Sequence, residues 1–142
     1  MASQITIGLL TMCLTAYIHM WMLGIALTAF SPLSNWVHQK RSAFRLSAVM
    51  ATTMVWVMAA HLLEVGLWAV VFQALGIFND VSTSLYFSLV AYTTLGFGDI
   101  ILPENWRLLS GLAAANGFLV FGWSTAFQVD LLGDLKRDAV EN

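Results

Sequence analysis

Three long apolar stretches run along the chain, and polar positions inside them are few. Residues 5–30 contain no formally charged side chain, and residues 46–78 are interrupted only by His61 and Glu64. Residues 106–132 carry charge only near their ends. Because a helix that crosses a bilayer needs about 20 predominantly apolar residues, the pattern predicts three membrane-spanning helices.

A fourth apolar stretch, 82–101, has a different pattern, because it contains two adjacent threonines, two glycines and an aspartate. Its first part, 82–93, is long enough for a helix of about 18 Å. Such a helix is too short to cross a hydrocarbon core of about 30 Å. A short helix followed by a glycine-rich segment between two spans indicates a re-entrant loop, so we predict an all-α membrane protein with three spans and one re-entrant helix.

The composition agrees with this fold class. The 142 residues are 59% apolar and only 10% charged, whereas a soluble domain carries about 25% charged residues. The lipid bilayer is therefore the expected environment. The formal net charge is −2 and there is no basic stripe, so we expect no nucleic-acid partner. The single cysteine, Cys13, excludes an intrachain disulfide.

The basic residues set the expected orientation, because cytoplasmic loops carry an excess of Lys and Arg. Arg107 falls on one side of the membrane, and five basic residues fall on the other: Lys40, Arg41, Arg45, Lys136 and Arg137. We expect the N-terminus outside, with residues 1–30 as an extra N-terminal helix that is too long and too uncharged at its start for a signal peptide. A cytoplasmic interfacial linker at 31–45 and a short cytoplasmic tail at 133–142 follow. The expected location is a plasma (inner) membrane.

The segment Thr94–Asp99 reads Thr-Leu-Gly-Phe-Gly-Asp and carries the candidate chemistry. Irregular backbone at membrane depth must be buried in protein or line a water-filled path. Gly96 and Gly98 permit backbone angles that other residues avoid, so successive carbonyls can turn to one side. Such carbonyls, together with the Thr94 hydroxyl, can replace the hydration shell of a monovalent cation.

With this motif after a short apolar helix and between two spans, the sequence resembles the potassium-channel pore family. The resemblance covers a pore module at 46–132, with outer helix 46–78, pore helix 82–93, filter 94–99 and inner helix 105–132. It implies a fourfold-symmetric homotetramer that conducts dehydrated K⁺ and has no enzymatic activity and no organic cofactor. Mixed tetramers with other channel subunits stay open as an alternative. The implied K⁺-binding residues are Thr94, Leu95, Gly96, Phe97 and Gly98.

Two positions depart from the family's pattern. Phe97 stands where the filter usually has a tyrosine, and Val90 stands where some members have a glutamate that shares a proton with the filter aspartate. We therefore expect a filter held more by packing than by hydrogen bonds, with Asp99 bonded to Trp106 or to water. The expected filter supports are Tyr86, Phe87, Tyr92 and Trp106.

Acidic residues are expected at the outer mouth, where they would raise the local cation concentration. Asp99 is the first of them, and Asp80 and Glu104 lie nearby in the sequence. The alternative for Asp80 and Glu104 is that each is a solvated loop charge.

The inner helix has a face that is expected to line the cavity and the gate, with residues three or four positions apart: Leu119, Gly122, Ala126 and Asp130. Asp130 either attracts cations at the inner mouth or marks the membrane interface. Gly117 or Gly122 is either a hinge or a packing residue, since glycine is common at helix contacts in membranes.

His19, His61 and Glu64 are ionisable residues inside the spans, where such groups usually face protein or water. His61 and Glu64 share a helix face, and His19 is expected at a similar depth. Three interpretations are open: a hydrogen-bonded group that fastens the first span to the pore module, a proton sensor, or a site for Zn²⁺ or Fe²⁺. With the channel interpretation no transition metal is expected.

Two alternatives to a potassium-selective channel follow for the whole protein. The first is a weakly selective or non-selective monovalent cation channel, which the absence of a filter tyrosine would allow. The second belongs to another class and is a small membrane metalloprotein that uses His19, His61 and Glu64.

Overall fold

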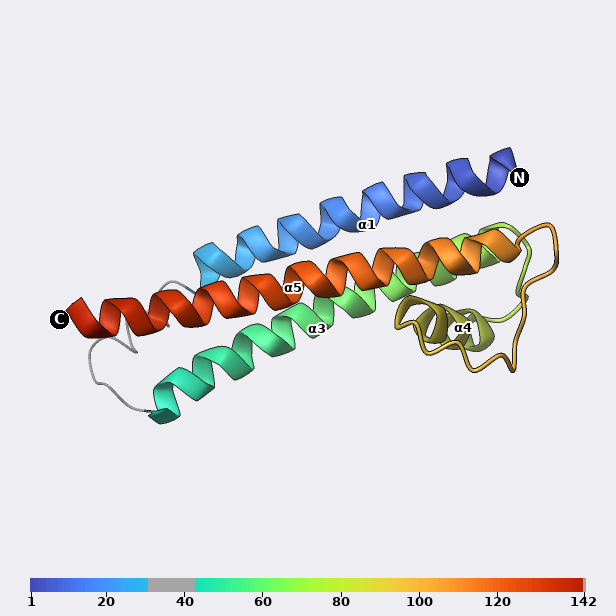
Figure 1. The fold of residues 1–142 in the computed structure, drawn as a ribbon. Helices are drawn as coiled ribbons and strands as arrows, with labels where there is room; N and C mark the ends of the chain where they lie inside the picture. Colours follow the sequence, from blue (N-terminus) through green and yellow to red (C-terminus); the bar gives the residue numbers. More distant parts are fainter. Residues whose placement is uncertain (31–42, 142) are drawn as a thin grey trace.

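Four helices form the described part of the chain: α1 (Ala2–Ala29), α3 (Ala43–Ala74), α4 (Val81–Tyr92) and α5 (Arg107–Glu141) (Figure 1). The computed structural model describes residues 1–30 and 43–141, with side chains as far as residue 135. No strand occurs within these ranges. The helices α1, α3 and α5 are long and apolar enough to cross a membrane. The predicted class, an all-α membrane protein with three spans, is confirmed.

The three long helices lie alongside one another, and α1 packs against both α3 and α5 (Figure 1). The short helix α4 packs against α3 and α5 at one end of this bundle. The N-terminus and the connection from α4 to α5 lie at the same end, and the C-terminus lies at the opposite end. The re-entrant segment and the start of α1 therefore share one side of the molecule.

The helix α3 ends before the predicted boundary at residue 78, because a glycine closes it. Gly76 adopts a φ of 67°, in the left-handed region that glycine enters without a side-chain clash. Its N–H donates to the Gln73 carbonyl at 2.8 Å, and the N–H of Ile77 donates to the Phe72 carbonyl at 3.0 Å. These two bonds form a Schellman motif, which satisfies carbonyls at a helix end. A Gly-Ile pair after an apolar run is the sequence signal for this stop.

Two predicted boundaries on the C-terminal side of the membrane need correction. The inner helix was expected to end at 132, but α5 continues to Glu141 and includes almost all of the predicted tail 133–142. Hydropathy falls after 132, but the following Leu, Lys, Arg and Ala residues favour helix, so the helix continues beyond its apolar part. The predicted linker 31–45 lies outside the described residues up to 42, and its last residues begin α3.

The main apolar core joins α3, α4 and α5 at the end of the bundle that holds the re-entrant helix. Phe72 of α3 and Phe87 of α4 meet edge to face with ring centroids 5.2 Å apart, an arrangement that aromatic pairs prefer. The buried members of this core are Val65, Trp68, Phe72, Phe87, Ala91, Tyr92, Leu102, Leu109 and Ala113. This packing fixes α4 relative to the inner helix α5.

Polar bonds attach α1 to the pore module near both of its ends. The Gln4 side-chain oxygen accepts a hydrogen bond from the backbone N–H of Leu108 at 3.1 Å, so α1 satisfies an N–H group in the first turn of α5 that has no partner within its own helix. Near the other end, the Trp56 indole N–H donates to the Met22 carbonyl at 2.8 Å.

A third attachment lies between these two, at Asn116 of α5. Its side-chain oxygen accepts from the Thr15 hydroxyl of α1 at 2.8 Å and from the Trp68 indole of α3 at 2.9 Å. In a bilayer the lipid tails are as apolar as leucine, so polar bonds and close packing take over the role of the hydrophobic effect between helices. Asn116 thus fastens three helices together.

Candidate functional site

The predicted filter begins where α4 ends, and its first residues are bonded to the last turn of that helix. The N–H of Thr94 donates to the Ala91 carbonyl at 2.9 Å, and the N–H of Gly96 donates to the Val90 carbonyl at 3.3 Å. The C-terminal end of α4 therefore points into the loop. The negative end of the helix dipole lies there, and it favours a nearby cation.

The backbone of this loop alternates between left-handed and ordinary conformations. Thr94, Gly96 and Gly98 have φ angles of 62°, 53° and 77°, whereas Leu95 and Phe97 have no positive φ. Alternation of this kind separates N–H groups from C=O groups along a short segment. Thr94 is the only non-glycine residue of the described ranges with a positive φ, and strained backbone of this kind gathers at functional sites.

The filter residues are exposed in the single chain, from Thr94 through Asp99. The large apolar side chains of Leu95 and Phe97 are 59% and 65% exposed. Because irregular backbone at membrane depth must be buried in protein or line a water path, one chain does not complete this segment.

Asp99 is bonded to a residue other than the one expected. The Tyr86 hydroxyl donates to Asp99 Oδ2 at 2.6 Å, whereas Trp106 packs against the apolar core. The expectation that Asp99 bonds to Trp106 is therefore wrong. Tyr86 lies in the middle of α4, and the loop folds back along the helix so that Asp99 reaches it. This tyrosine links the middle of α4 to the end of the filter loop.

The other predicted filter supports take part in the packing between helices, and Phe87 also lines the pocket beside Thr94 and Asp99. Phe87 belongs to the core described above and contacts the rings of Phe72 and Phe78. Tyr92 is fully buried, and its hydroxyl donates to the Glu64 carboxylate. Within one chain, Tyr86 and Phe87 therefore lie beside the filter loop, whereas the Tyr92 hydroxyl is directed to α3.

Asp80 and Glu104, predicted at the outer mouth, have different environments. Asp80 is the N-cap of α4, where its side chain accepts a hydrogen bond from the Thr83 N–H at 2.7 Å. This hydrogen bond lowers the pKa of the Asp80 carboxyl below its usual value. Glu104 is exposed. Asp80 therefore has a structural function whatever it contributes to attracting cations.

The predicted cavity-lining residues of α5 lie on a face that none of the described helices covers. Leu119, Gly122, Ala126 and Asp130 are all exposed. Gly117 lies on the opposite, buried face, where a Cβ atom would overlap the backbone carbonyl of Tyr92. Close packing of α5 against α4 therefore requires glycine at 117. A Cβ built at Gly122 meets nothing within 4 Å outside the adjacent backbone of its own helix, so no close contact requires glycine there, and the hinge function stays a prediction.

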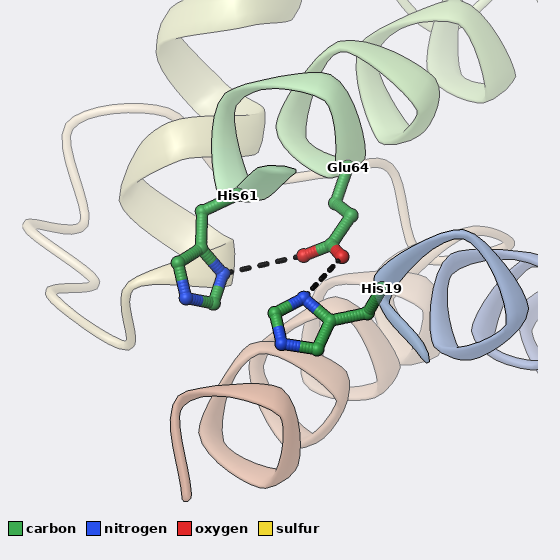
Figure 2. A group of neighbouring side chains, drawn as sticks. All are labelled: His19, His61 and Glu64. Carbon is green, nitrogen blue, oxygen red and sulfur yellow. Dashed lines mark hydrogen bonds and ion pairs between the residues drawn. The ribbon is translucent and has the colours of Figure 1, made fainter. Parts of the chain in front are cut away.

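The three intramembrane ionisable residues come together in the middle of the bundle (Figure 2). Glu64 lies between the two imidazoles. Its carboxylate is 2.8 Å from His19 Nδ1 and 3.2 Å from His61 Nδ1. His19 and Glu64 are fully buried, and His61 is 4% exposed. The group joins α1 to α3, as Figure 2 shows.

Two further residues, which the sequence did not point to as members of this group, complete it. The Tyr92 hydroxyl of α4 donates to Glu64. The Ser124 hydroxyl of α5 is 3.0 Å from His19 Nε2 and 2.9 Å from His61 Nε2. A serine in the apolar run of the inner helix was the available signal for Ser124. All four helices therefore contribute to one hydrogen-bonded cluster, which we call the histidine cluster (His19, His61, Glu64, Tyr92 and Ser124).

The metalloprotein interpretation finds no support in this geometry. The candidate ligand atoms of His19, His61 and Glu64 lie within 4.8 Å of one another, but both Nδ1 atoms are hydrogen-bonded to the carboxylate and both Nε2 atoms face Ser124. The polar atoms are satisfied by one another.

A comparison with protein families gives one match, to a family model described as an ion channel, over residues 60–133. This range is just over half of the chain and contains the second part of α3, the whole re-entrant segment and most of α5. It supports the resemblance to the potassium-channel pore family. No curated protein and no solved structure matches the chain.

Proposed function

The chain belongs to the ion channel family, and from this premise we propose that it forms a potassium-selective channel. K⁺ is the transported ion. It would lose its hydration shell to rings of backbone carbonyls from Thr94, Leu95, Gly96 and Phe97, with the Thr94 hydroxyl as a further oxygen ligand. Gly98 would complete the turn towards Asp99 at the outer mouth.

The alternating backbone of residues 94–98 is the observation that carries this proposal. Positive φ angles at every second position allow carbonyls to be directed to one side, which a cation pathway needs. The Tyr86–Asp99 bond at 2.6 Å holds the far end of the segment against α4. No other part of the described chain combines glycine-rich irregular backbone with a position between two spans.

The proposed assembly is a homotetramer, as the resemblance to the potassium-channel pore family implies. One exposed segment cannot enclose an ion, and oligomers built from one chain usually have closed symmetry. In such an assembly the exposed filter residues would face one another around the axis. The uncovered face of α5 would line the inner cavity, with Leu119 and Ala126 along it and Asp130 at its inner end. Four α4 helices would direct the negative ends of their dipoles at the cavity.

The proposed location is a plasma (inner) membrane, with the N-terminus outside and the C-terminus cytoplasmic. The arrangement of basic residues supports this orientation. Because the N-terminus and the connection from α4 to α5 lie at the same end of the bundle, the filter would open to the outside.

A weakly selective cation channel is the second candidate, and one observation favours it. Phe97 lacks the hydroxyl that would tie the filter to a neighbouring pore helix, and its ring is 65% exposed in the single chain. Selectivity then depends on how firmly other copies pack against this ring.

Flux into liposomes tests the proposal and separates the two candidates. We expect the reconstituted protein to pass K⁺ but not Na⁺, with block by Ba²⁺. Gly96→Ala is the control, since φ is 53° at this position and a side chain would be strained there. Equal K⁺ and Na⁺ flux would favour the non-selective channel. Flux that survives Gly96→Ala would contradict the assignment of the filter.

A further inference from the structure

The histidine cluster takes no part in the proposed conduction, and its hydrogen bonds define which protons it can hold. The Glu64 carboxylate faces three groups: Nδ1 of His19, Nδ1 of His61 and the Tyr92 hydroxyl. A carboxylate only accepts hydrogen bonds. Each Nδ1 therefore carries a hydrogen, and the two Nε2 atoms are the positions at which the cluster gains or loses a proton.

Ser124 limits the protonation states that are fully hydrogen-bonded at these Nε2 atoms, because its hydroxyl lies 3.0 Å from Nε2 of His19 and 2.9 Å from Nε2 of His61. The hydroxyl has one hydrogen and two lone pairs. When neither Nε2 atom carries a hydrogen, the Ser124 hydroxyl can donate to only one of them. The other Nε2 lone pair then faces a lone pair of the serine oxygen. With one proton added, one Nε2–H donates to Ser124 and Ser124 donates to the other imidazole. This state is fully hydrogen-bonded, and the imidazolium balances the Glu64 carboxylate.

A second proton also finds a complete set of partners. Both Nε2–H groups then donate to the two lone pairs of Ser124, and the serine hydrogen turns to the Val120 carbonyl, which is 3.1 Å away. The net charge of the cluster rises from zero to +1. Because a serine that bonds to the carbonyl four residues earlier tends to bend its helix, proton uptake acts on the turn of α5 that contains Gly122.

A cavity of about 390 Å³ between α3 and α5 reaches this cluster from one side. Its wall includes His61 and Ser124, together with Thr125, Gln128 and several apolar side chains. Most lining residues come from the first half of α3 and the second half of α5, which lie towards the end of the bundle that holds the C-terminus (Figure 1), and His61 and Phe121 lie at the opposite end of the cavity. His61 is therefore the imidazole that a proton meets first.

We propose that His19, His61, Glu64 and Ser124 form a proton-binding site that is loaded through this cavity from the C-terminal side of the membrane. Uptake of the second proton reduces K⁺ conduction, a consequence that rests on the proposed function. A positive charge beside the inner helix opposes a cation in a low-dielectric surrounding, and the serine hydrogen moves onto the backbone of α5 at the same time.

The titratable groups that face this site come from three of the four helices. They are His19 of α1, His61 and Glu64 of α3, and the Tyr92 hydroxyl of α4. Within the described residues, α5 contributes the hydroxyl of Ser124 and no titratable side chain to the cluster. The site thus contains the Glu64 carboxylate and two imidazoles that both donate to it.

Protonation can be measured without any ion flux. We suggest ¹⁵N NMR of the histidine side chains in the full-length protein in nanodiscs, between roughly pH 5 and 8, where an imidazole ordinarily titrates. The His38→Gln background removes the third histidine of the sequence. We expect acid to convert a state with one imidazolium into a state with two. Two neutral imidazoles throughout, or two imidazoliums throughout, would overturn the proposal.

The side of access and the effect on conduction are measured in oriented channels, with pH changed on one side at a time. We expect acid on the C-terminal side to reduce K⁺ current, and acid on the other side to have no effect. Ser124→Ala should lose this response. Thr125→Ala is the matched control, since Thr125 lines the same cavity and donates to its own helix backbone but contacts neither histidine; it should keep the response.

The outcomes separate this proposal from the proposed function. A pH response that is unchanged in Ser124→Ala, or that comes from the opposite side, would overturn the proton site as the cause. If a histidine titrates as expected in the NMR experiment but no K⁺ flux occurs at any pH, the proton-binding site stands and the proposed function fails.

Discussion

The filter loop and the histidine cluster both place polar groups at membrane depth, and they satisfy those groups in opposite ways. The loop from Thr94 to Gly98 is exposed in the single chain, and its backbone is turned by positive φ angles. The histidine cluster is buried, and its side-chain bonds close within one chain. In the proposed channel the loop would depend on other copies and on ions, whereas the cluster is closed by the four helices that the structure describes. Substitutions in the two regions should therefore have different effects.

Removing the anion of the cluster should give the largest loss of stability. Glu64→Ala leaves two buried imidazoles and the Tyr92 hydroxyl without their acceptor. Breaking a buried charge pair from one side costs about 3–5 kcal/mol, so we expect a large fall in the thermal unfolding midpoint of the purified protein in detergent. Glu104→Ala, at an exposed carboxylate, is the control and should leave the midpoint unchanged. Equal midpoints for the two variants would mean that the cluster does not hold the bundle together.

A methyl group between the two regions should have the next largest effect. Gly117→Ala places a Cβ against the Tyr92 carbonyl, and overpacking of this kind costs about 1–3 kcal/mol. We expect a lower unfolding midpoint and altered flux, because α5 must move away from α4. Gly111→Ala, where the added Cβ meets nothing within 4 Å outside the adjacent backbone of its own helix, is the matched control. A stable Gly117→Ala variant with ordinary flux would contradict the close α4–α5 contact.

Removing one hydroxyl at the filter should change conduction but not stability. Tyr86→Phe deletes the hydrogen bond to Asp99 and keeps the ring. We expect a lower ratio of K⁺ to Na⁺ flux, because Asp99 is no longer held against α4. The unfolding midpoint should stay unchanged, because the lost hydrogen bond is at an exposed carboxylate. Tyr17→Phe, at a tyrosine of α1 that is 71% exposed, should change neither. A lower unfolding midpoint for Tyr86→Phe with unchanged flux would contradict the assignment of this bond to conduction, because the bond would then stabilise the fold.

The smallest effect is expected at the start of α4. The pKa of Asp80 is lowered by its bond to the Thr83 N–H, so the ionised carboxylate is the form that the fold favours. The stabilisation is present at neutral pH and is lost as the pH falls through the lowered pKa. Asp80→Asn keeps a capping side chain but cannot ionise, so its midpoint should depend less on acid than that of the parent protein, and most of the stability should remain. An acid dependence equal to that of the parent protein would show that the Asp80 carboxylate does not contribute to it.

The sequence predicted the elements better than the side-chain partners. Apolar run length was enough to predict three spans and a short re-entrant helix, because the bilayer sets the length of a span. It was not enough for the boundaries: Gly76 ends α3 through its left-handed backbone, and α5 extends beyond its apolar part. Helix ends depend on local backbone bonds and helix propensity, which a hydropathy pattern does not contain.

The candidate site divides in the same way. His19, His61 and Glu64 were predicted at one depth, and they meet. The partners Ser124, Tyr92 and Tyr86 depend on how each helix is rotated about its own axis when it packs. Spacing along one helix does not fix that rotation. For this reason Tyr92 was expected at the filter although its hydroxyl reaches Glu64.

The most direct test of potassium selectivity is the reversal potential of single channels with K⁺ on one side of a planar bilayer and Na⁺ on the other. A pore built from the carbonyls of Thr94–Phe97 should give a reversal potential far from zero, with the sign set by K⁺. A reversal potential near zero would mean that both ions pass equally. The claim of a potassium-selective filter would then be wrong, whatever the flux measured in liposomes.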